Sequence, residues 1–269
     1  MTKELADNLK DSDIVILEDL GEGVQRITLN RASQRNAMNR AARLGLVAAL
    51  DNCRDNGKTK VVIITGSGSA FCSGVDLKEA RQNPAGWSPP DTLENRRSLW
   101  HGVQDEIRLH PAIVIAAVNG VALGGGVTLV NTCDLAIASE TAEFGMPEVS
   151  FGAFPGLAGP STMLRTSMKR AAFMVLTGNR ISAQEAQEWG LINLVVSADE
   201  LQSEAILLAR RIATFNAHTL EFSKRALWNV PTHIADYSAA LQYGITLNAE
   251  IQRKMKSSES SSLGVEEKS

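Results

Sequence analysis

The sequence predicts an α/β protein, built on strands that are buried on both faces and separated by amphipathic helices. Residues 60–65 (KVVIIT) and 113–118 (IVIAAV) are nearly continuous apolar runs, which suits strands covered on both faces better than half-exposed ones. Ahead of the first run, apolar residues recur on roughly one face of a predicted helix that ends at Asn56-Gly57. These residues are Leu44, Val47, Ala48 and Leu50.

The other early elements follow in chain order. Residues 14–17 and 24–29 are rich in β-branched side chains and flank the turn at 21–23 (GEG), which predicts a hairpin. Residues 135–138 (LAIA) predict a further strand. The segment 82–91 (QNPAGWSPPD) contains three prolines and a glycine, so we expect a loop, and long loops in compact domains often border sites.

The last third of the chain predicts only helices. Two capping boxes, 182–185 (SAQE) and 197–200 (SADE), are expected to open two of them. The second predicted helix reaches residue 212 and has one apolar face. That face comprises Leu201, Ala205, Leu208 and Ile212.

The length of 269 residues suits one large domain with an appendage. We divide the chain into a core at 1–200, a C-terminal helical region at 201–255 and a tail at 256–269. The tail is serine-rich and polar and lacks periodicity, so we expect it to be disordered.

Composition excludes several classes of protein. The net charge of −3 shows no basic excess, so nucleic acid is not an expected partner. Cys53, Cys72 and Cys133 are widely spaced and form no zinc-like cluster, which predicts reduced thiols, no disulfide and no metal site. The N-terminus lacks an apolar signal, and no run is long enough to span a membrane. We therefore expect a cytoplasmic protein.

Two glycine clusters, 66–78 (GSGSAFCSGVDLK) and 119–126 (NGVALGGG), each follow one of the buried strands. Ligands of α/β sheets bind at the carboxyl ends of strands, where glycines let backbone N–H groups point at an anion. Two such amides could form an oxyanion hole, although glycines after strands also serve simply as turns. Neither cluster has the spacing of a phosphate-binding or dinucleotide-binding loop, and no G-x-S-x-G motif of serine hydrolases is present.

Seven motifs in a fixed order then carry a resemblance. They are 34–38 (QRNAM), 70–78 (AFCSGVDLK), 117–126 (AVNGVALGGG), 133–138 (CDLAIA), 144–149 (FGMPEV), 176–178 (LTG) and 183–196. As a set they resemble the crotonase, or enoyl-CoA hydratase/isomerase, superfamily along nearly the whole chain. The resemblance implies a crotonase-like spiral of ββα units, with residues 1–200 as an acyl-CoA-binding core. It also implies that the C-terminal helical region mediates trimerisation, as a homotrimer or a dimer of trimers.

The same resemblance assigns catalytic roles. The amides of Val75 and Gly125 fall where the family stabilises the oxygen of a thioester enolate, and Glu148 aligns with the family's acid/base carboxylate. Alone, Glu148 reads as a surface glutamate in a loop; the surrounding motifs make it the leading catalytic candidate. Hydratases of the family carry a second glutamate where this chain has Thr128, which cannot act as a carboxylate base. The exchange favours a single-base shuttle, or a water bound by Thr128, over straight-chain hydration.

Coenzyme A is expected to enter as part of an acyl-CoA thioester substrate, with no separate cofactor. By resemblance, the residues that bind it are Arg35, Ala37, Ser73, Val75, Asp76 and Leu77. Arg35 is a plausible phosphate partner, and Asp76 is of a type that fixes turns through side-chain-to-backbone hydrogen bonds. His101 and Cys72 are interpreted as structural residues.

The sequence therefore predicts an enoyl-CoA hydratase/isomerase-type enzyme. A hydroxycinnamoyl-CoA hydratase-lyase, which often has serine at the Thr128 position, remains an alternative. So does a hydrolase or decarboxylase of a β-oxo or malonyl-type thioester. A non-catalytic acyl-CoA-binding scaffold is the alternative from another class. Dehalogenase relatives need an aspartate within 153–156, and this segment (AFPG) has none.

Overall fold

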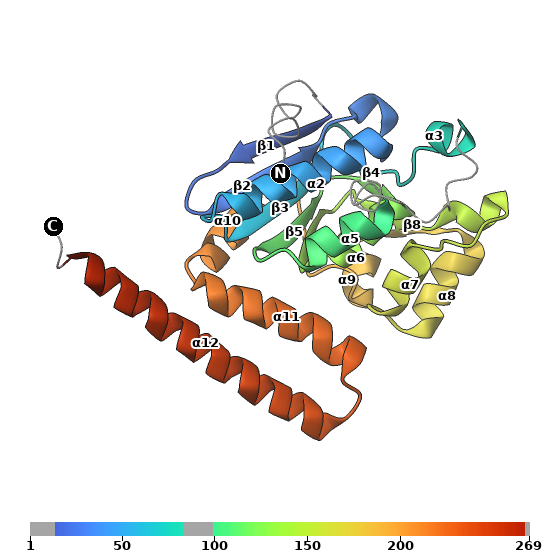
Figure 1. Cartoon of the computed structure of the whole chain (residues 1–269). Helices are drawn as coiled ribbons and strands as arrows, with labels where there is room; N and C mark the ends of the chain where they lie inside the picture. Colours follow the sequence, from blue (N-terminus) through green and yellow to red (C-terminus); the bar gives the residue numbers. More distant parts are fainter. Residues whose placement is uncertain (1–13, 83–98, 267–269) are drawn as a thin grey trace.

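A six-stranded sheet forms the centre of the computed structural model, which describes residues 14–82 and 99–266, with side chains to residue 256. The strand order is β1-β2-β3-β5-β7-β10. β1 and β2 form the predicted antiparallel hairpin, and the other neighbours are parallel. The strands are β1 Val15–Asp19, β2 Val24–Leu29, β3 Val61–Gly66, β5 Ile113–Val118, β7 Leu135–Ser139 and β10 Leu194–Val196 (Figure 1).

A second, four-stranded sheet has the order β4-β6-β8-β9 and consists of three-residue strands. They are β4 Ala70–Cys72, β6 Val121–Leu123, β8 Glu143–Gly145 and β9 Arg180–Ser182. A long strand is followed by a short one three times, in the pairs β3–β4, β5–β6 and β7–β8, and a helical segment comes next each time. These repeats are the ββα units of the spiral that the sequence predicts.

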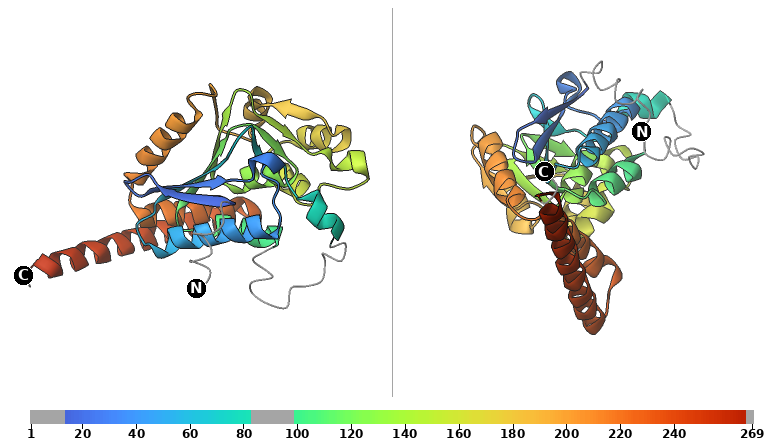
Figure 2. Two further views of the ribbon diagram at one scale, coloured as in Figure 1. Left: turned by 90° about the horizontal axis from the view of Figure 1, so that it is seen from above. Right: turned by 60° about the vertical axis from the view of Figure 1, so that its left-hand side comes forward.

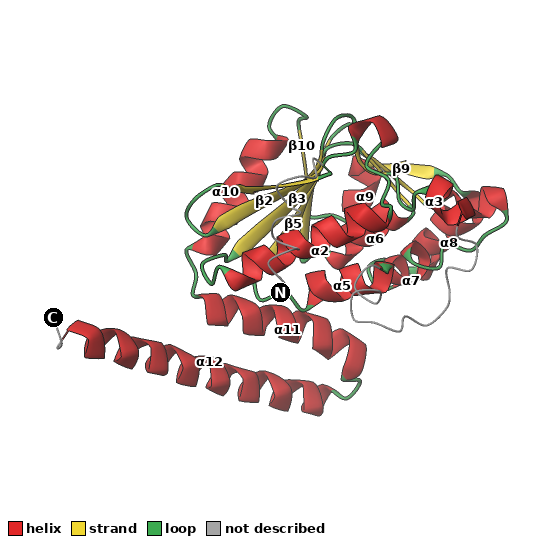
Figure 3. Cartoon of the chain, turned by 45° about the horizontal axis from the view of Figure 1, so that its top comes forward, coloured by secondary structure: helices red, strands yellow, loops and turns green. Residues whose placement is uncertain are grey.

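The long strands are buried on both faces because helices cover both sides of the six-stranded sheet (Figure 3). Val62 and Ile64 of β3 join the core under α2 (Arg40–Asp55) and α5 (Trp100–Arg108). Val61 and Ile63, which point the other way, pack with α10 (Leu201–Ala213). The prediction from continuous apolar runs is confirmed.

Within the described residues, seven further helical segments precede the last helices of the chain. They are η1 Ala32–Gln34, α3 Leu77–Gln82, α6 Gly125–Thr132, η2 Pro147–Phe151, α7 Ala158–Met163, α8 Met168–Thr177 and α9 Ala183–Trp189. The capping box at Ser182 forms as predicted, because Ser182 and Glu185 each accept the other's backbone N–H.

Several predicted elements differ in the structure. The Ser197 hydroxyl donates to the Glu200 carboxylate at 2.6 Å instead of capping a backbone N–H, so α10 begins only at Leu201. The last third is not purely helical, because β9 and β10 add short strands at the sheet edges. Three residues are too few for an alternating pattern to be recognised. The loop expected at 82–91 lies outside the described residues apart from Gln82, which ends α3.

Two helices complete the chain, α11 (Ala217–His233) and α12 (Tyr237–Glu266). α12 extends away from the body of the molecule (Figures 1 and 2). It runs to Glu266. The disordered tail expected at 256–269 stays a prediction. The core boundary at residue 200 stays a prediction, although α10 packs on the sheet and α11 does not begin until Ala217.

α11 is attached to the core by a buried ion pair. Lys224, with 2% of its side chain exposed, donates to the Asp134 carboxylate at 2.8 Å and to the carbonyls of Ile107 and Ala112. Trp228 donates its indole N–H to the same carboxylate at 3.1 Å. Within the described ranges, no helix is both long and apolar enough to cross a membrane.

Candidate active site

The two glycine clusters meet where β3 and β5 end. These parallel strands pair in register from Val61 with Ile113 to Thr65 with Ala117, so their carboxyl ends lie side by side. A Cβ at Gly120 would overlap the carbonyl oxygen of Ser69, and one at Gly126 would overlap that of Cys72. The close backbone approach therefore requires glycine at both positions.

This approach brings the two proposed oxyanion amides together. Gly74 has φ +89°, and a Cβ there would lie 3.0 Å from the Gly125 nitrogen. Met38 forms a parallel bridge with Val75, donating to the Gly74 carbonyl at 2.8 Å and accepting from the residue after Val75. In such a bridge the N–H of Val75 itself points away from Met38. Gly125 is the first residue of α6, where helix N–H groups have no partner within the helix and the dipole favours negative charge.

A left-handed turn beside the Val75 loop holds it in place. Arg35 and Asn36 have φ of +50° and +55°, a conformation that asparagine tolerates better than most residues. The buried Asn36 side chain donates to the carbonyls of Ser67 and Ala70 at 3.0 and 2.8 Å. Ser73 donates its N–H to the Arg35 carbonyl at 3.0 Å. The motif at 34–38 thus holds the motif at 70–78 in place through hydrogen bonds.

Asp76 fixes the start of α3, as its residue type predicts. Its carboxylate accepts the N–H groups of Lys78 at 3.1 Å and Glu79 at 3.4 Å. It also pairs with Arg31 at 2.9 Å, and Arg31 donates to the Ala37 carbonyl as well. Although burial alone would raise it, the pKa of Asp76 lies below its ordinary value because of Arg31 and these N–H groups.

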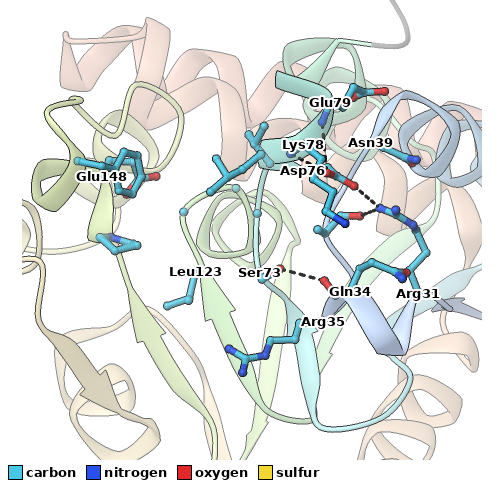
Figure 4. A pocket seen from close by; sticks show the side chains of 18 of the residues that line it. Arg31, Gln34, Arg35, Asn39, Ser73, Asp76, Lys78, Glu79, Leu123 and Glu148 are labelled. Atoms are coloured by element: carbon cyan, nitrogen blue, oxygen red, sulfur yellow. Dashed lines mark hydrogen bonds and ion pairs between the residues drawn. The ribbon is translucent and has the colours of Figure 1, made fainter. Parts of the chain in front are cut away.

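These elements enclose a cavity of about 1060 Å³. Gly125 and Glu148 line this cavity. So does every residue predicted to bind coenzyme A, namely Arg35, Ala37, Ser73, Val75, Asp76 and Leu77. Glu148 lies across the cavity from the Arg31–Asp76 pair (Figure 4). One cavity wall therefore contains the Arg35 cation, the backbone of Val75 and Gly125, and the Glu148 carboxyl group.

The Glu148 carboxyl group lies against the backbone at the start of α6. Pro147 opens η2 with the φ that a helix start needs, and Glu148 follows it. A Cβ on Gly124, which has φ +50°, would be only 2.5 Å from Oε1 of Glu148. Its Oε2 is buried and has no hydrogen-bond partner in the part of the chain that the structure describes. Burial raises the pKa of Glu148, which is the direction that brings a carboxylate closer to a useful general base at neutral pH.

The structure does not bring Thr128 to the cavity. Its side chain is fully buried, its hydroxyl donates to the Gly124 carbonyl at 3.4 Å within α6, and it is not part of the cavity wall. His101 is exposed and is not part of the cavity wall, so its structural role stays a prediction. Burial raises the pKa of the Cys72 thiol to about 12, which does not favour a nucleophile. Among the described residues, no three His, Cys, Asp or Glu side chains gather in a way that could hold a metal ion.

The sequence model of the enoyl-CoA hydratase/isomerase family matches residues 19–268. The chain belongs to this family. It is 37% identical over 202 residues to 2,3-dehydroadipyl-CoA hydratase of Escherichia coli, covering 75% of this chain and 76% of that protein. It is 32% identical over 228 residues to 1,2-epoxyphenylacetyl-CoA isomerase of the same organism, covering 84% of this chain and 87% of that protein.

Solved structures agree with the family assignment. An enoyl-CoA hydratase subunit from Geobacillus kaustophilus aligns with a TM-score of 0.80 at 31% identity, covering 96% of this chain and 98% of that one. The human enoyl-CoA hydratase domain-containing protein 3 aligns with a TM-score of 0.79 at 31% identity, covering 88% and 91%. This chain is therefore an enoyl-CoA hydratase/isomerase family enzyme with the crotonase fold.

Three residues that support this cavity or the helix beside it were not among the predicted site residues. Arg31 orders the Asp76 loop, and Asn36 supports the turn before it. Trp100 is 8% exposed and packs its ring against Gly125, where a Cβ would be 2.5 Å from the ring. The Asn within the QRNAM motif was a usable signal for the turn. Arg31 and Trp100 contact residues more than 20 positions away, and no local pattern reveals such pairs.

Proposed function

We propose that this enzyme transfers a proton on an acyl-CoA thioester through an enolate. In this proposal the N–H groups of Val75 and Gly125 bind the thioester oxygen, and Glu148 removes and returns the proton. The observation that carries it is the buried Oε2 of Glu148, which has no hydrogen-bond partner within residues 14–82 and 99–266 and belongs to a cavity wall shared with Gly125. Backbone donors aimed at developing charge typically contribute on the order of 10²–10³ in rate.

Glu148 is proposed to act as a single base. The other described carboxylates in the cavity wall are already engaged, Asp76 by Arg31 and Glu79 by the Arg40 N–H at 2.9 Å. Hydration through two carboxylates lets one activate water while the other moves the α-proton. A single carboxylate can take a proton from one carbon and deliver it to another. This favours double-bond isomerisation over straight-chain hydration, and one of the relatives described above is itself named an isomerase.

The substrate is proposed to carry its own coenzyme A, so that no separate cofactor is required. Arg35, at the cavity wall, is the proposed partner of a coenzyme A phosphate, because a guanidinium matches phosphate geometry. We further propose that the enzyme works in the cytoplasm as a homotrimer or a dimer of trimers. Exposed apolar residues on the C-terminal helices, such as Leu227, Leu241 and Ile245, support an oligomer.

The test is turnover of a panel of CoA thioesters by the wild type and by Glu148→Gln, followed by mass spectrometry. The panel includes 2-enoyl, 3-enoyl, feruloyl and malonyl-type substrates. We expect double-bond migration on a 3-enoyl thioester, with a loss of about 10²–10⁴ in Glu148→Gln.

Running the reaction in D2O separates the mechanisms. A single base that returns the same proton leaves much of the product unlabelled, whereas hydration introduces solvent deuterium. Tight binding of the thioesters without turnover would refute the proposal and indicate a scaffold. Equal activity of Glu148→Gln would refute the role of Glu148.

A further inference from the structure

A second cavity, of about 330 Å³, lies at the other end of α6. The candidate active site contains Gly125 at the start of this helix, whereas the second cavity contains Asn131 and Thr132 at its end. The two ends are about 10 Å apart at 1.5 Å per residue, and no residue lines both cavities. α5, α11, α7 and the residues that flank α7 supply the rest of the wall. The second cavity is therefore separate from the acyl-CoA site.

Two arginines give this cavity its charge. The guanidinium groups of Arg108 and Arg165 stack over the ring of Trp228, at 4.9 and 4.3 Å from its centroid. Asp134 is already hydrogen-bonded to Lys224, and Asp105 approaches Arg108 only to 3.8 Å with 58% of its side chain exposed. The described groups around the cavity thus carry an excess of positive charge.

Two residues of the wall also have a buried side-chain atom without a hydrogen-bond partner among the described residues. Nε of Arg108 is a donor without an acceptor, and Oδ1 of Asn131 is an acceptor without a donor. The side-chain NH2 group of Asn131 donates to the hydroxyls of Ser161 and Thr162 at 3.2 and 3.0 Å, which fixes the orientation of the side chain. Asn131 is 3% exposed, so water does not compensate its oxygen from the surface.

The end of α6 would ordinarily disfavour an anion, because helix C-termini carry partial negative charge. Here Arg165 donates both Nε and Nη2 to the Asn131 carbonyl, at 3.2 and 3.1 Å. The arginine covers that carbonyl and adds a full positive charge beside it. Leu157 and Leu164 contribute an apolar wall. The cavity combines cations, an unpaired acceptor and apolar surface in a volume suited to a small molecule.

We propose that this cavity binds a small anion that also carries a hydrogen-bond donor, such as hydrogen phosphate or a hydroxycarboxylate. An anionic oxygen of the ligand accepts from Arg108, and its O–H donates to Oδ1 of Asn131. Sulfate has the size of phosphate but no proton at neutral pH, so it can accept from Arg108 but cannot donate to Asn131. Lactate and acetate differ in the same way, because lactate has a hydroxyl group and acetate has none.

Isothermal titration calorimetry of the full-length protein with phosphate, sulfate, lactate and acetate tests the site. We expect phosphate and lactate to bind about tenfold tighter than sulfate and acetate, since each good polar pairing contributes on this scale. Arg108→Gln should weaken phosphate binding at least about tenfold. Arg170→Gln is the matched control, because Arg170 also stacks on an indole, that of Trp189, but lies outside the cavity.

Thr232→Glu gives a second line of evidence that does not depend on removing a buried arginine. Thr232 is exposed on α11 at the cavity wall, so a glutamate there brings a tethered carboxylate that should compete with phosphate. Thr232→Gln is its control. Saturating coenzyme A and the Glu148→Gln variant should leave phosphate binding unchanged, which separates this site from the acyl-CoA cavity.

Three ligand-binding results would each overturn the inference. They are undetectable phosphate binding at tens of millimolar, equal affinity in Arg108→Gln, and equal affinity for sulfate. A change of sedimentation coefficient in Arg108→Gln without a change in phosphate binding would also overturn it, because the cavity would then receive a second copy of the chain.

Discussion

Gly124 controls the position of the Glu148 carboxyl group, and Gly124→Ala tests that control. The glycine has φ +50° and ψ −113°, a region that alanine enters only with strain of about 1–3 kcal/mol. Its new Cβ would be 2.5 Å from Oε1 of Glu148. A carbon and an oxygen in van der Waals contact need roughly 3.3 Å, so the carboxyl group must retreat by about 0.8 Å. Misplacement of about 1 Å can cost about 10² in rate.

The assay compares kcat, KM and urea unfolding of Gly124→Ala with those of Gly152→Ala. Gly152 follows η2 with φ +79° and ψ +23° and has no atom within 4 Å of an added Cβ, so it has a positive φ with milder backbone strain and no collision. Both variants should lose stability, and only Gly124→Ala should lose about 10² in kcat. Similar kcat values in the two variants, or a Gly124→Ala enzyme within threefold of wild type, would refute the reasoning.

Three further predictions concern charged and thiol groups. Because the pKa of Glu148 is raised, kcat/KM should increase with pH above the ordinary range of glutamate, and Glu148→Gln should abolish that limb of a pH–rate profile. The folded protein binds the proton of Glu148 more tightly than the unfolded chain does. The free energy of unfolding should therefore fall as the pH rises from the ordinary pKa of glutamate through the raised pKa of Glu148. Glu148→Gln should unfold at a higher urea concentration than wild type at pH 7, and this difference should vanish at pH 4. Lys224→Met leaves the Asp134 carboxylate buried without its cation and should cost about 3–5 kcal/mol by urea unfolding. Lys60→Met removes a lysine that bonds only to carbonyls and should cost about 1 kcal/mol, so equal losses would contradict an ion-pair effect. Iodoacetamide at pH 8 should not label Cys72 in the folded protein, because its pKa is raised to about 12, whereas rapid labelling would show that the loop opens.

The elements with strong local patterns were predictable from the sequence. β3 and β5 are long enough to show continuous apolar runs, and the glycine clusters that follow them mark the shared sheet edge. The motif resemblance also selected residues that the structure places around one cavity, from Arg35 to Glu148. Their catalytic and binding roles remain predictions.

What could not be predicted depends on contacts between distant residues. The strands of the second sheet are three residues long, and pairing with their neighbours rather than a sequence pattern defines them. Thr128 was placed in the site by its position in a motif, but the turn of α6 directs its hydroxyl to a carbonyl of the same helix. Ser197 had the spacing of a capping residue, and its hydroxyl bonds to the Glu200 carboxylate instead.

Gly120 and Gly126, where two backbone segments approach closely, also determine which mutations this enzyme tolerates. At Gly120 and Gly126 every substitution adds a Cβ where the carbonyl oxygen of Ser69 or Cys72 already lies, so a conservative exchange to alanine is blocked as firmly as one to tryptophan. Val75 and Leu77 differ, because their side chains can change while their backbone N–H groups persist. In a saturation library, variants with altered acyl preference should therefore accumulate at such wall positions, and the glycine codons should remain invariant.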